Sequence, residues 1–294
     1  MIRLIFAYHS SMDPLALGRM DDFAGTIGLR SELALRALQF AAANKLTCER
    51  TDGVTPAVIF NRDASGRHGN FHPLADQAIC SNPAWAKRLN KVHTASKRVR
   101  ARADWRWMEL DSANSSDALL MNIFCHPEVP GRPAVRALLG LASDAEPHFG
   151  VKPRTPMLGN RYDTTEIDMR IGDVLIEAKL TESDFQTAKP NLILRYRDLE
   201  QVFDFAELPV RNEKVIGYQL IRGTLAAHAS GCSFCVCCDA RRHDLIEIWY
   251  RIIRAVQPFD LRCRMKLLTW QELAAAVSHD LATFLAIKYG VFPA

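Results

Sequence analysis

Residues 164–180 read TTEIDMRIGDVLIEAKL, and this stretch predicts a tight β-hairpin. Gly172-Asp173 suits a two-residue turn, and it lies between two runs in which apolar and polar residues alternate. Such a turn fixes the register of the two strands, because successive side chains of a strand point to opposite faces. The pairs that lie opposite each other are then Ile171 with Val174, Asp168 with Glu177, and Glu166 with Lys179.

This register gives the hairpin one apolar and one polar face. Opposed Cβ atoms lie roughly 5 Å apart, so Asp168 and Glu177 are close enough to share a divalent cation. Two like charges in this position destabilise a sheet unless a cation or a proton lies between them. The apolar face carries Ile167, Met169, Ile171, Val174, Ile176 and Ala178, and the polar face carries Glu166, Asp168, Arg170, Leu175, Glu177 and Lys179.

Lys179 completes a chemically suggestive set on the polar face. It follows Glu177 by two residues, within reach of a phosphate or a water molecule held by a cation. Phosphodiester hydrolysis needs a cation that lowers the pKa of a bound water and a positive group that steadies the attacking water or the phosphoryl oxygen. The alternative interpretation is an ordinary amphipathic hairpin, whose polar face contacts solvent and forms weak surface ion pairs.

The hairpin resembles the catalytic motif of the PD-(D/E)XK nuclease superfamily. Asp168 matches the lone aspartate of that motif and Glu177-Ala178-Lys179 matches its E-x-K element, although the proline of the motif is absent. The resemblance implies that Asp168, Glu177 and the carbonyl of Ala178 bind Mg²⁺ or Mn²⁺. It also implies that Lys179 positions the nucleophilic water.

A second stretch points to one branch of that superfamily. Residues 115–124, SSDALLMNIF, resemble the Ser-Ser…Asn…Phe helix of a bacterial restriction-endonuclease-like branch. That branch also tends to carry Thr-Glu shortly after the lysine, as Thr181-Glu182 does here. The resemblance covers roughly residues 105–275. Asn122 and Phe124 are expected to brace the helix against the sheet.

The resemblance suggests further participants around the hairpin. Glu166 is expected to act as an outer-shell base or as a ligand of a second metal. Relatives often carry one helical acid upstream, and Glu109 and Asp117 both remain candidates for it. Gln219 resembles a glutamine that many such nucleases place near the metal-bound phosphate. Arg222 lies three residues later, on the same face of the expected helix, although such polar pairs are more often simply solvated.

A basic segment between residues 87 and 106 suggests a polyanionic partner, as does the net charge of +4. Basic side chains attract phosphates, and nearby tryptophans could stack on bases. The alternative is a solvated, partly helical segment whose tryptophans pack on the core. The segment carries Lys87, Arg88, Lys91, Lys97, Arg98, Arg100, Arg102 and Arg106 against the single acid Asp104, with Trp85, Trp105 and Trp107 nearby.

Eight cysteines raise the question of a second metal centre. Cys232, Cys235, Cys237 and Cys238 form a C-x-x-C-x-C-C string, a pattern that could hold zinc or an iron–sulfur cluster. No second C-x-x-C accompanies it, and the string reads as a buried strand. The pattern therefore favours free cysteines acting as small apolar core residues.

Length and composition allow one large domain or two modest ones in a chain of 294 residues that is 48% hydrophobic and 24% charged. No apolar run is long enough for a membrane span, and the N-terminus does not resemble a signal peptide, so a cytoplasmic protein is expected. The expected fold is an α/β (α+β) restriction-endonuclease-like core, a mixed sheet flanked by helices. We expect an N-terminal helical, loop-rich extension at 1–82 and the nuclease-like domain at 83–294.

The order of elements expected around the hairpin is helix, hairpin, helix, strand, helix, strand, helix. Expected helices cover 83–110, 116–125, 133–141, 194–208, 213–230 and 244–256, and a further helix begins at the capping box Thr269-Trp270-Gln271-Glu272. Strands are expected at 234–239 and 265–268. The strand that usually precedes the hairpin in this superfamily is not evident.

Together these features predict a Mg²⁺-dependent nuclease that acts on DNA as an endonuclease and could work as a homodimer. One rival is a non-catalytic module that keeps the fold and binds nucleic acid without cutting it. The other is a scaffold in which the cysteine cluster holds a structural metal.

Overall fold

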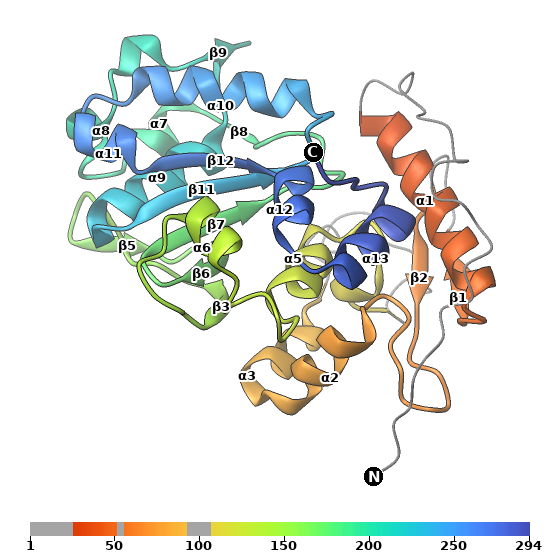
Figure 1. The fold of residues 1–294 in the computed structure, drawn as a ribbon. Coiled ribbons are helices and arrows are strands. Elements are labelled where there is room, and N and C mark those ends of the chain that lie inside the picture. The colour runs from red at the N-terminus through yellow and green to blue at the C-terminus, as the bar shows by residue number, and fades with distance from the viewer. Residues whose placement is uncertain (1–25, 52–55, 93–106) are drawn as a thin grey trace.

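The computed structural model describes residues 26–51, 56–92 and 107–294, and a mixed sheet forms its centre (Figure 1). β11 runs parallel to both β7 and β12, whereas β6 pairs antiparallel with β7 and β3 antiparallel with β6. The expected α/β architecture with a mixed central sheet is therefore confirmed. The strands lie in the order β12 (Met265–Thr269), β11 (Ser233–Cys238), β7 (Val174–Ala178), β6 (Ile167–Ile171) and β3 (Pro147–Val151).

The hairpin forms with the register that its turn predicts. Ile171 pairs with Val174, and the ladder continues to Met169 and Ile176. Gly172 takes φ 57°, the left-handed conformation that a tight two-residue turn needs and that glycine adopts without strain. The prediction from Gly172-Asp173 is thus confirmed.

Side chains on one face of the sheet pack under a layer of helices that includes both ends of the described chain. The apolar hairpin residues contribute Met169, Ile171, Val174, Ile176 and Ala178 to this cluster. Ile167 was expected on the same face, but it packs on the other face of the sheet with Leu175. The pairing of β6 with β7 ends at Met169, two residues short of Ile167. The covering helices are α1 (Thr26–Ala43), α5 (Ser116–Phe124), α6 (Pro133–Leu139), α12 (Trp270–Ala276) and α13 (His279–Tyr289).

The opposite face is covered by helices from the segment between the hairpin and β12. Trp249 and Ile252 lie on the apolar stripe of α10 and pack against the sheet with Phe234. α9 connects β7 to β11 and α10 connects β11 to β12, as parallel strands require. The helices are α7 (Pro190–Ile193), α8 (Leu199–Val202), α9 (Tyr218–Ser230), α10 (His243–Ala255) and α11 (Phe259–Cys263).

Smaller elements surround this core. β1 (Cys48–Arg50) pairs with β2 (Val58–Phe60), and β4 (Thr155–Met157) pairs with β5 (Arg161–Asp163). A three-stranded sheet has the order β8 (Thr187–Ala188), β10 (Lys214–Ile216) and β9 (Val210–Arg211). The remaining helical turns are α2 (Pro73–Ser81), α3 (Pro83–Ala86), η2 (Lys87–Asn90), η4 (Glu109–Asp111) and η5 (Phe205–Glu207).

Three expected helices are wrong in extent. The expected helix at 213–230 begins only at Tyr218, because Asn212 and Glu213 take φ 50° and 59° and form the turn between β9 and β10. The expected helix at 194–208 is divided into α8 and η5, and the Asp204 side chain caps η5 by accepting the N–H of Ala206. In the described part of 83–110, helical structure is limited to the short turns α3, η2 and η4.

Other expected boundaries agree closely with the structure. The side chain of Ser115, one residue before the expected cap, accepts the N–H of Ala118 at the start of α5. Thr269 and Glu272 form the expected capping box, and Gly231 ends α9 in the left-handed conformation. The described part of 48–82, within the extension expected to be helical and loop-rich, contains β1, β2 and α2.

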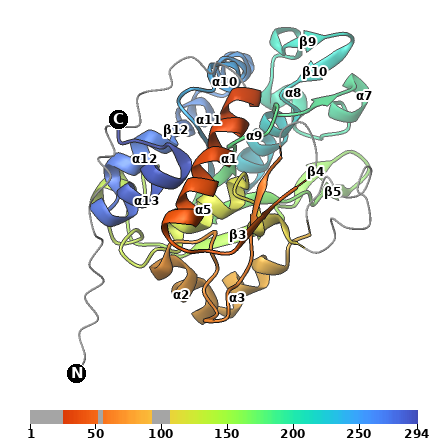
Figure 2. The ribbon, with the colours of Figure 1, turned by 90° about the vertical axis from the view of Figure 1, so that its right-hand side faces the viewer.

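The first helix belongs to the same hydrophobic cluster as the sheet. Leu33 and Phe40 of α1 are buried in that cluster, and Figure 2 shows α1 alongside α13. A domain boundary at residue 82 stays a prediction. No helix in the described residues is long and apolar enough to cross a bilayer.

The cysteine string is buried in β11 and divided between the two faces of the sheet. Cys235 and Cys237 lie in the cluster under α5 and α12, whereas Cys238 and the preceding Cys232 lie in the cluster under α9 and α10. Alternation along the strand thus points them in opposite directions. Their burial agrees with the interpretation as apolar core residues.

Candidate functional site

The two stretches that resemble nuclease motifs meet in the structure. Ser116, at the start of α5, donates its hydroxyl to Oε1 of Glu182 at 2.6 Å. The other carboxylate oxygen of Glu182 accepts the N–H of Leu180 at 2.7 Å, and Thr181 Oγ1 donates to the carbonyl of Asn114 at 3.4 Å. These contacts fix the beginning of α5 against the segment that follows Lys179.

Glu177 and Lys179 are buried rather than solvated. They are 3% and 5% exposed, which excludes for these two residues the interpretation as a solvent-facing polar surface. Lys179 Nζ lies 2.8 Å from Oε1 of Glu177. Backbone bonds hold the lysine in place: its N–H donates to the carbonyl of Cys237, and its carbonyl accepts the indole N–H of Trp270, both at 2.8 Å.

The charge of Lys179 is maintained by its acidic neighbours. Burial by itself lowers the pKa of a lysine, but the negative charges of Glu177, Glu182 and Asp168 outweigh it and raise the pKa of Lys179. The ammonium group therefore stays protonated across the working range of most enzymes. It is available to hold an anionic or polarised oxygen.

The surroundings of Asp168, by contrast, favour its uncharged form. Its Oδ2 accepts the N–H of Ala178 at 2.8 Å, which aims the carboxylate across the hairpin beyond the last paired residues. Burial first, and then the negative charges of Glu177 and Asp117, raise the pKa of Asp168 well above its ordinary value. A divalent cation bound here would relieve this repulsion.

Arg88 and Lys91, two residues of the basic segment, point into this acidic region. Arg88 Nη2 lies 2.9 Å from Asp117 and 2.7 Å from Glu166. Lys91 Nζ lies 2.5 Å from Asp117, 3.3 Å from Glu166 and 3.2 Å from Glu109. Asp117, Glu166, Glu109, Arg88 and Lys91 are here called the ion-pair cluster. It compensates the acidic charge that surrounds Asp168.

The ion-pair cluster also sets the protonation of its own members. Burial pushes the pKa of Glu166 upward, but the hydrogen bonds and charges of Arg88 and Lys91 hold it below its usual value. Burial raises the pKa of Glu109 despite its contact with Lys91. Of the two upstream acids that the sequence leaves open, Asp117 is the one whose charge acts on Asp168.

The other basic residues of this segment are either exposed to solvent or lie outside the part of the chain that the structure describes. Lys87 is exposed to solvent, and Lys97, Arg98, Arg100 and Arg102 lie outside the described residues. Trp85 donates its indole N–H to the carbonyl of Pro147 and packs edge-on against Phe149. A role of these basic residues in binding nucleic acid stays a prediction.

Gln219 and Arg222 lie on α9 beside the hairpin. The backbone N–H of Gln219 donates to the carbonyl of Phe185, whose ring centroid lies 5.7 Å from Lys179 Nζ. Oε1 of Gln219 is buried and has no hydrogen-bond partner within the described parts of the chain. Arg222 is buried and donates to the carbonyl of Glu166 at 3.3 Å. Arg222 thus contacts a residue of the ion-pair cluster, whereas the role of Gln219 stays a prediction.

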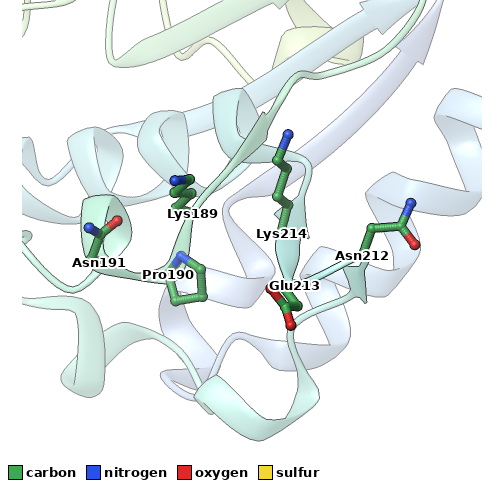
Figure 3. A pocket seen from close by; sticks show the side chains of 6 residues that line it. All are labelled: Lys189, Pro190, Asn191, Asn212, Glu213 and Lys214. Carbon is green, nitrogen blue, oxygen red and sulfur yellow. The ribbon is translucent and has the colours of Figure 1, made fainter.

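A surface hollow of about 450 Å³ lies elsewhere. Figure 3 shows its lining between α7 and the turn from β9 to β10. None of these lining residues belongs to the hairpin or to the ion-pair cluster, so the hollow is separate from the candidate site. They are Lys189, Pro190, Asn191, Asn212, Glu213 and Lys214.

The structure contains a cluster of possible metal ligands that no sequence pattern indicates. Ring nitrogens of His72 and His126 and a carboxylate oxygen of Asp280 lie within 4.8 Å of one another. The three residues are widely separated in the chain, so no local spacing could reveal them. His68, four residues before His72, is not part of the cluster and contacts Asp111 instead.

Comparison with known proteins places the chain in a family. No curated protein and no solved structure matches it. A family model described as "Restriction Endonuclease associating with ARP" matches residues 35–290, which includes the hairpin, α5 and most of the described structure. This chain therefore belongs to the REase-ARP family of restriction-endonuclease-like proteins.

Proposed function

We propose that this protein is a metal-dependent nuclease that hydrolyses phosphodiester bonds of DNA, with the hairpin as its active site. The observation that carries the proposal is the grouping of half-buried Asp168, near the start of β6, with buried Glu177 and Lys179, at and just after the end of β7. A protein has little structural reason to bury two like-charged carboxylates and a lysine together, because each charge loses hydration. Membership of a restriction-endonuclease family supports the same activity.

The donors present fit a hard divalent cation such as Mg²⁺ or Mn²⁺. Such ions prefer oxygen ligands, and the raised pKa of Asp168 reflects its burial together with the negative charges of Glu177 and Asp117, which nearby lysines do not fully compensate. Asp168, Glu177 and the carbonyl of Ala178 would hold the ion. When bound, it would supply a water of lowered pKa and stabilise the charge that develops on the phosphate.

The protein's own groups would do the remaining work. Lys179, kept protonated by its acidic neighbours, orients the attacking water or a phosphoryl oxygen. Glu166, held ionised by Arg88 and Lys91, accepts a proton through an intervening water or binds a second metal ion. Gln219 offers an unpartnered buried side-chain oxygen, and Arg222 donates to the carbonyl of Glu166, so both are assigned contacts to the phosphate region.

DNA binding is assigned in this proposal to Lys87, Arg88, Lys91 and Arg222, with Lys97, Arg98, Arg100 and Arg102 of the same basic segment. Cationic side chains beside an acidic catalytic centre supply the phosphate contacts that the carboxylates cannot make. A homodimer would allow both strands of a duplex to be cut. The rival proposal is a binding module that retains the fold without cleavage.

We expect the full chain to nick or linearise plasmid DNA with Mg²⁺ or Mn²⁺ and to be inactive in EDTA. Lys179→Ala should lower the cleavage rate by about 10²-fold or more, because the group that holds the water or phosphoryl oxygen is lost. The measurement is the rate of supercoiled-plasmid loss on a gel. Lys214→Ala, which changes an exposed lysine on β10, is the matched control and should keep the wild-type rate.

The same assay separates the two proposals. If wild-type protein binds duplex DNA, single-stranded DNA or RNA but cuts none of them with either metal, the non-catalytic module is the better description. Equal cleavage by wild type and Lys179→Ala would remove the hairpin lysine from the mechanism.

A further inference from the structure

A second cluster of metal-binding groups lies apart from the hairpin, on the side where α2, α5 and α13 meet. His72 is the N-cap of α2, His126 follows the C-terminal end of α5, and Asp280 lies in the first turn of α13. One ring nitrogen from each histidine and one carboxylate oxygen lie within 4.8 Å of one another. None of these residues belongs to the ion-pair cluster or the hairpin.

Burial and an unpartnered nitrogen distinguish this cluster from an ordinary polar patch. His72 and His126 are 3% and 0% exposed. Nε2 of His126 is buried and has no hydrogen-bond partner in the described structure. A buried polar atom without a partner is rare and calls for a missing water or ion. His72 Nε2 already lies 3.1 Å from Oδ2 of Asp280, close to the spacing of two ligands on one metal.

We propose that His72, His126 and Asp280 bind a Zn²⁺ ion. Two imidazoles and one carboxylate form a ligand set that suits Zn²⁺ and leaves a fourth position for water. The nitrogen donors disfavour Mg²⁺, which prefers oxygen ligands. The site is therefore different in chemistry from the hairpin site proposed for Mg²⁺ or Mn²⁺.

Zinc binding requires a proton shift on the rings. Nδ1 of His72 accepts the N–H of Leu74 at 3.3 Å, and Nδ1 of His126 accepts the N–H of Glu128 at 3.4 Å. If both Nε2 atoms bind the metal, each neutral ring carries its proton on Nδ1, and these two long contacts open. Both are at the weak end of the hydrogen-bond range, so little is lost. Burial also lowers the pKa of both rings and keeps them in the neutral form that binds metal.

The ion would connect α2 and α13 to the helix that carries Asp117. His126 and Asp117 lie at opposite ends of α5, roughly 10–13 Å apart along its axis. The backbone N–H of His72 also donates to Oδ1 of Asn122 in the middle of α5 at 2.6 Å. Zn²⁺ would thus fix the position of α5 from the end remote from the hairpin.

Metal binding by the full chain tests this site without reference to cleavage. After removal of metals by a chelator, titration calorimetry with ZnCl₂ should detect a site that MgCl₂ at the same concentration does not fill. His126→Gln and Asp280→Asn should each weaken it at least about tenfold. Co²⁺ in place of Zn²⁺ should give the visible bands of a four-coordinate ion, and both variants should lose them.

Control variants test whether the loss of Zn²⁺ binding is specific to the proposed ligands. Asp280→Asn is suited to the test because its side chain is 57% exposed and the amide oxygen can still accept from His72, so the fold should persist by circular dichroism. His279→Gln removes the exposed neighbouring histidine and should leave Zn²⁺ binding unchanged, as should Asp168→Asn at the hairpin. Absence of bound Zn²⁺ in the wild type, or binding that survives both His126→Gln and Asp280→Asn, would overturn the proposal.

Discussion

Asp168→Asn is expected to abolish metal-dependent DNA cleavage while making the metal-free protein more stable. The amide keeps an oxygen that can accept the N–H of Ala178, so the hairpin geometry is preserved. The variant removes a buried charge that Glu177 and Asp117 repel. We expect a loss in cleavage rate of about 10³-fold or more and a gain of about 1–2 kcal/mol in the free energy of unfolding.

The pH dependence of unfolding provides the check. Because the pKa of Asp168 is higher in the folded than in the unfolded chain, the unfolding free energy of the metal-free wild type falls as pH rises from about 4 through the raised pKa. Asp168→Asn lacks this contribution. The amount by which its free energy of unfolding exceeds that of the wild type should therefore grow with pH over that window and then level off. Urea unfolding of both proteins in EDTA measures the difference. A variant that is less stable than wild type above that window would contradict the inferred strain.

Asn122→Ala is expected to destabilise the protein strongly. Asn122 is fully buried, and its Oδ1 accepts the N–H of His72 at 2.6 Å. Its Nδ2 lies 3.1 Å from the carbonyl of Asn70, 2.8 Å from that of Ala118 and 3.3 Å from the hydroxyl of Tyr289. Removing the amide leaves buried groups without partners, and we expect a loss of about 3 kcal/mol.

Thermal and urea unfolding measure this loss. Asn191→Ala, on the exposed surface of α7, is the matched control and should stay within about 0.5 kcal/mol of wild type. Asn122→Asp keeps the acceptor for His72 but loses the donors, so it should destabilise through its other contacts. Wild-type stability in Asn122→Ala would mean that α5 does not depend on this amide.

The hairpin could be predicted because residues next to one another in the sequence determine it. A Gly-Asp turn and alternating polarity set the strand register from Ile171 and Val174 out to Met169 and Ile176, whereas the expected pair of Asp168 and Glu177 lies beyond the end of that ladder. Strand β3, by contrast, is an edge strand that contains Pro147 and Gly150 and lacks alternation, so no local pattern marks it. The late start of α9 depends on left-handed backbone at Asn212 and Glu213, which side-chain periodicity does not indicate.

The contacts around the candidate site could not be predicted from local sequence patterns. Arg88 and Lys91 were expected on a nucleic-acid-binding surface, but whether they contact Asp117 or solvent depends on how η2 docks against α5. The choice between Glu109 and Asp117 also needed the helix to be placed against the hairpin. The cluster of His72, His126 and Asp280 joins three segments far apart in the chain, and only the folded structure brings them together.

The dependence of α5 on α13 has a consequence for the order of events during synthesis. Asn122 contacts Tyr289, and Lys288 Nζ, buried beneath α13, donates to the side chain of Asn70 at 2.7 Å. These partners are separated by 167 and 218 residues, and α13 is the last described helix to leave the ribosome. Long-range contacts of this kind form late. A nascent chain from which α13 has not yet emerged would therefore have an incompletely anchored α5, the helix that carries Asp117 of the ion-pair cluster.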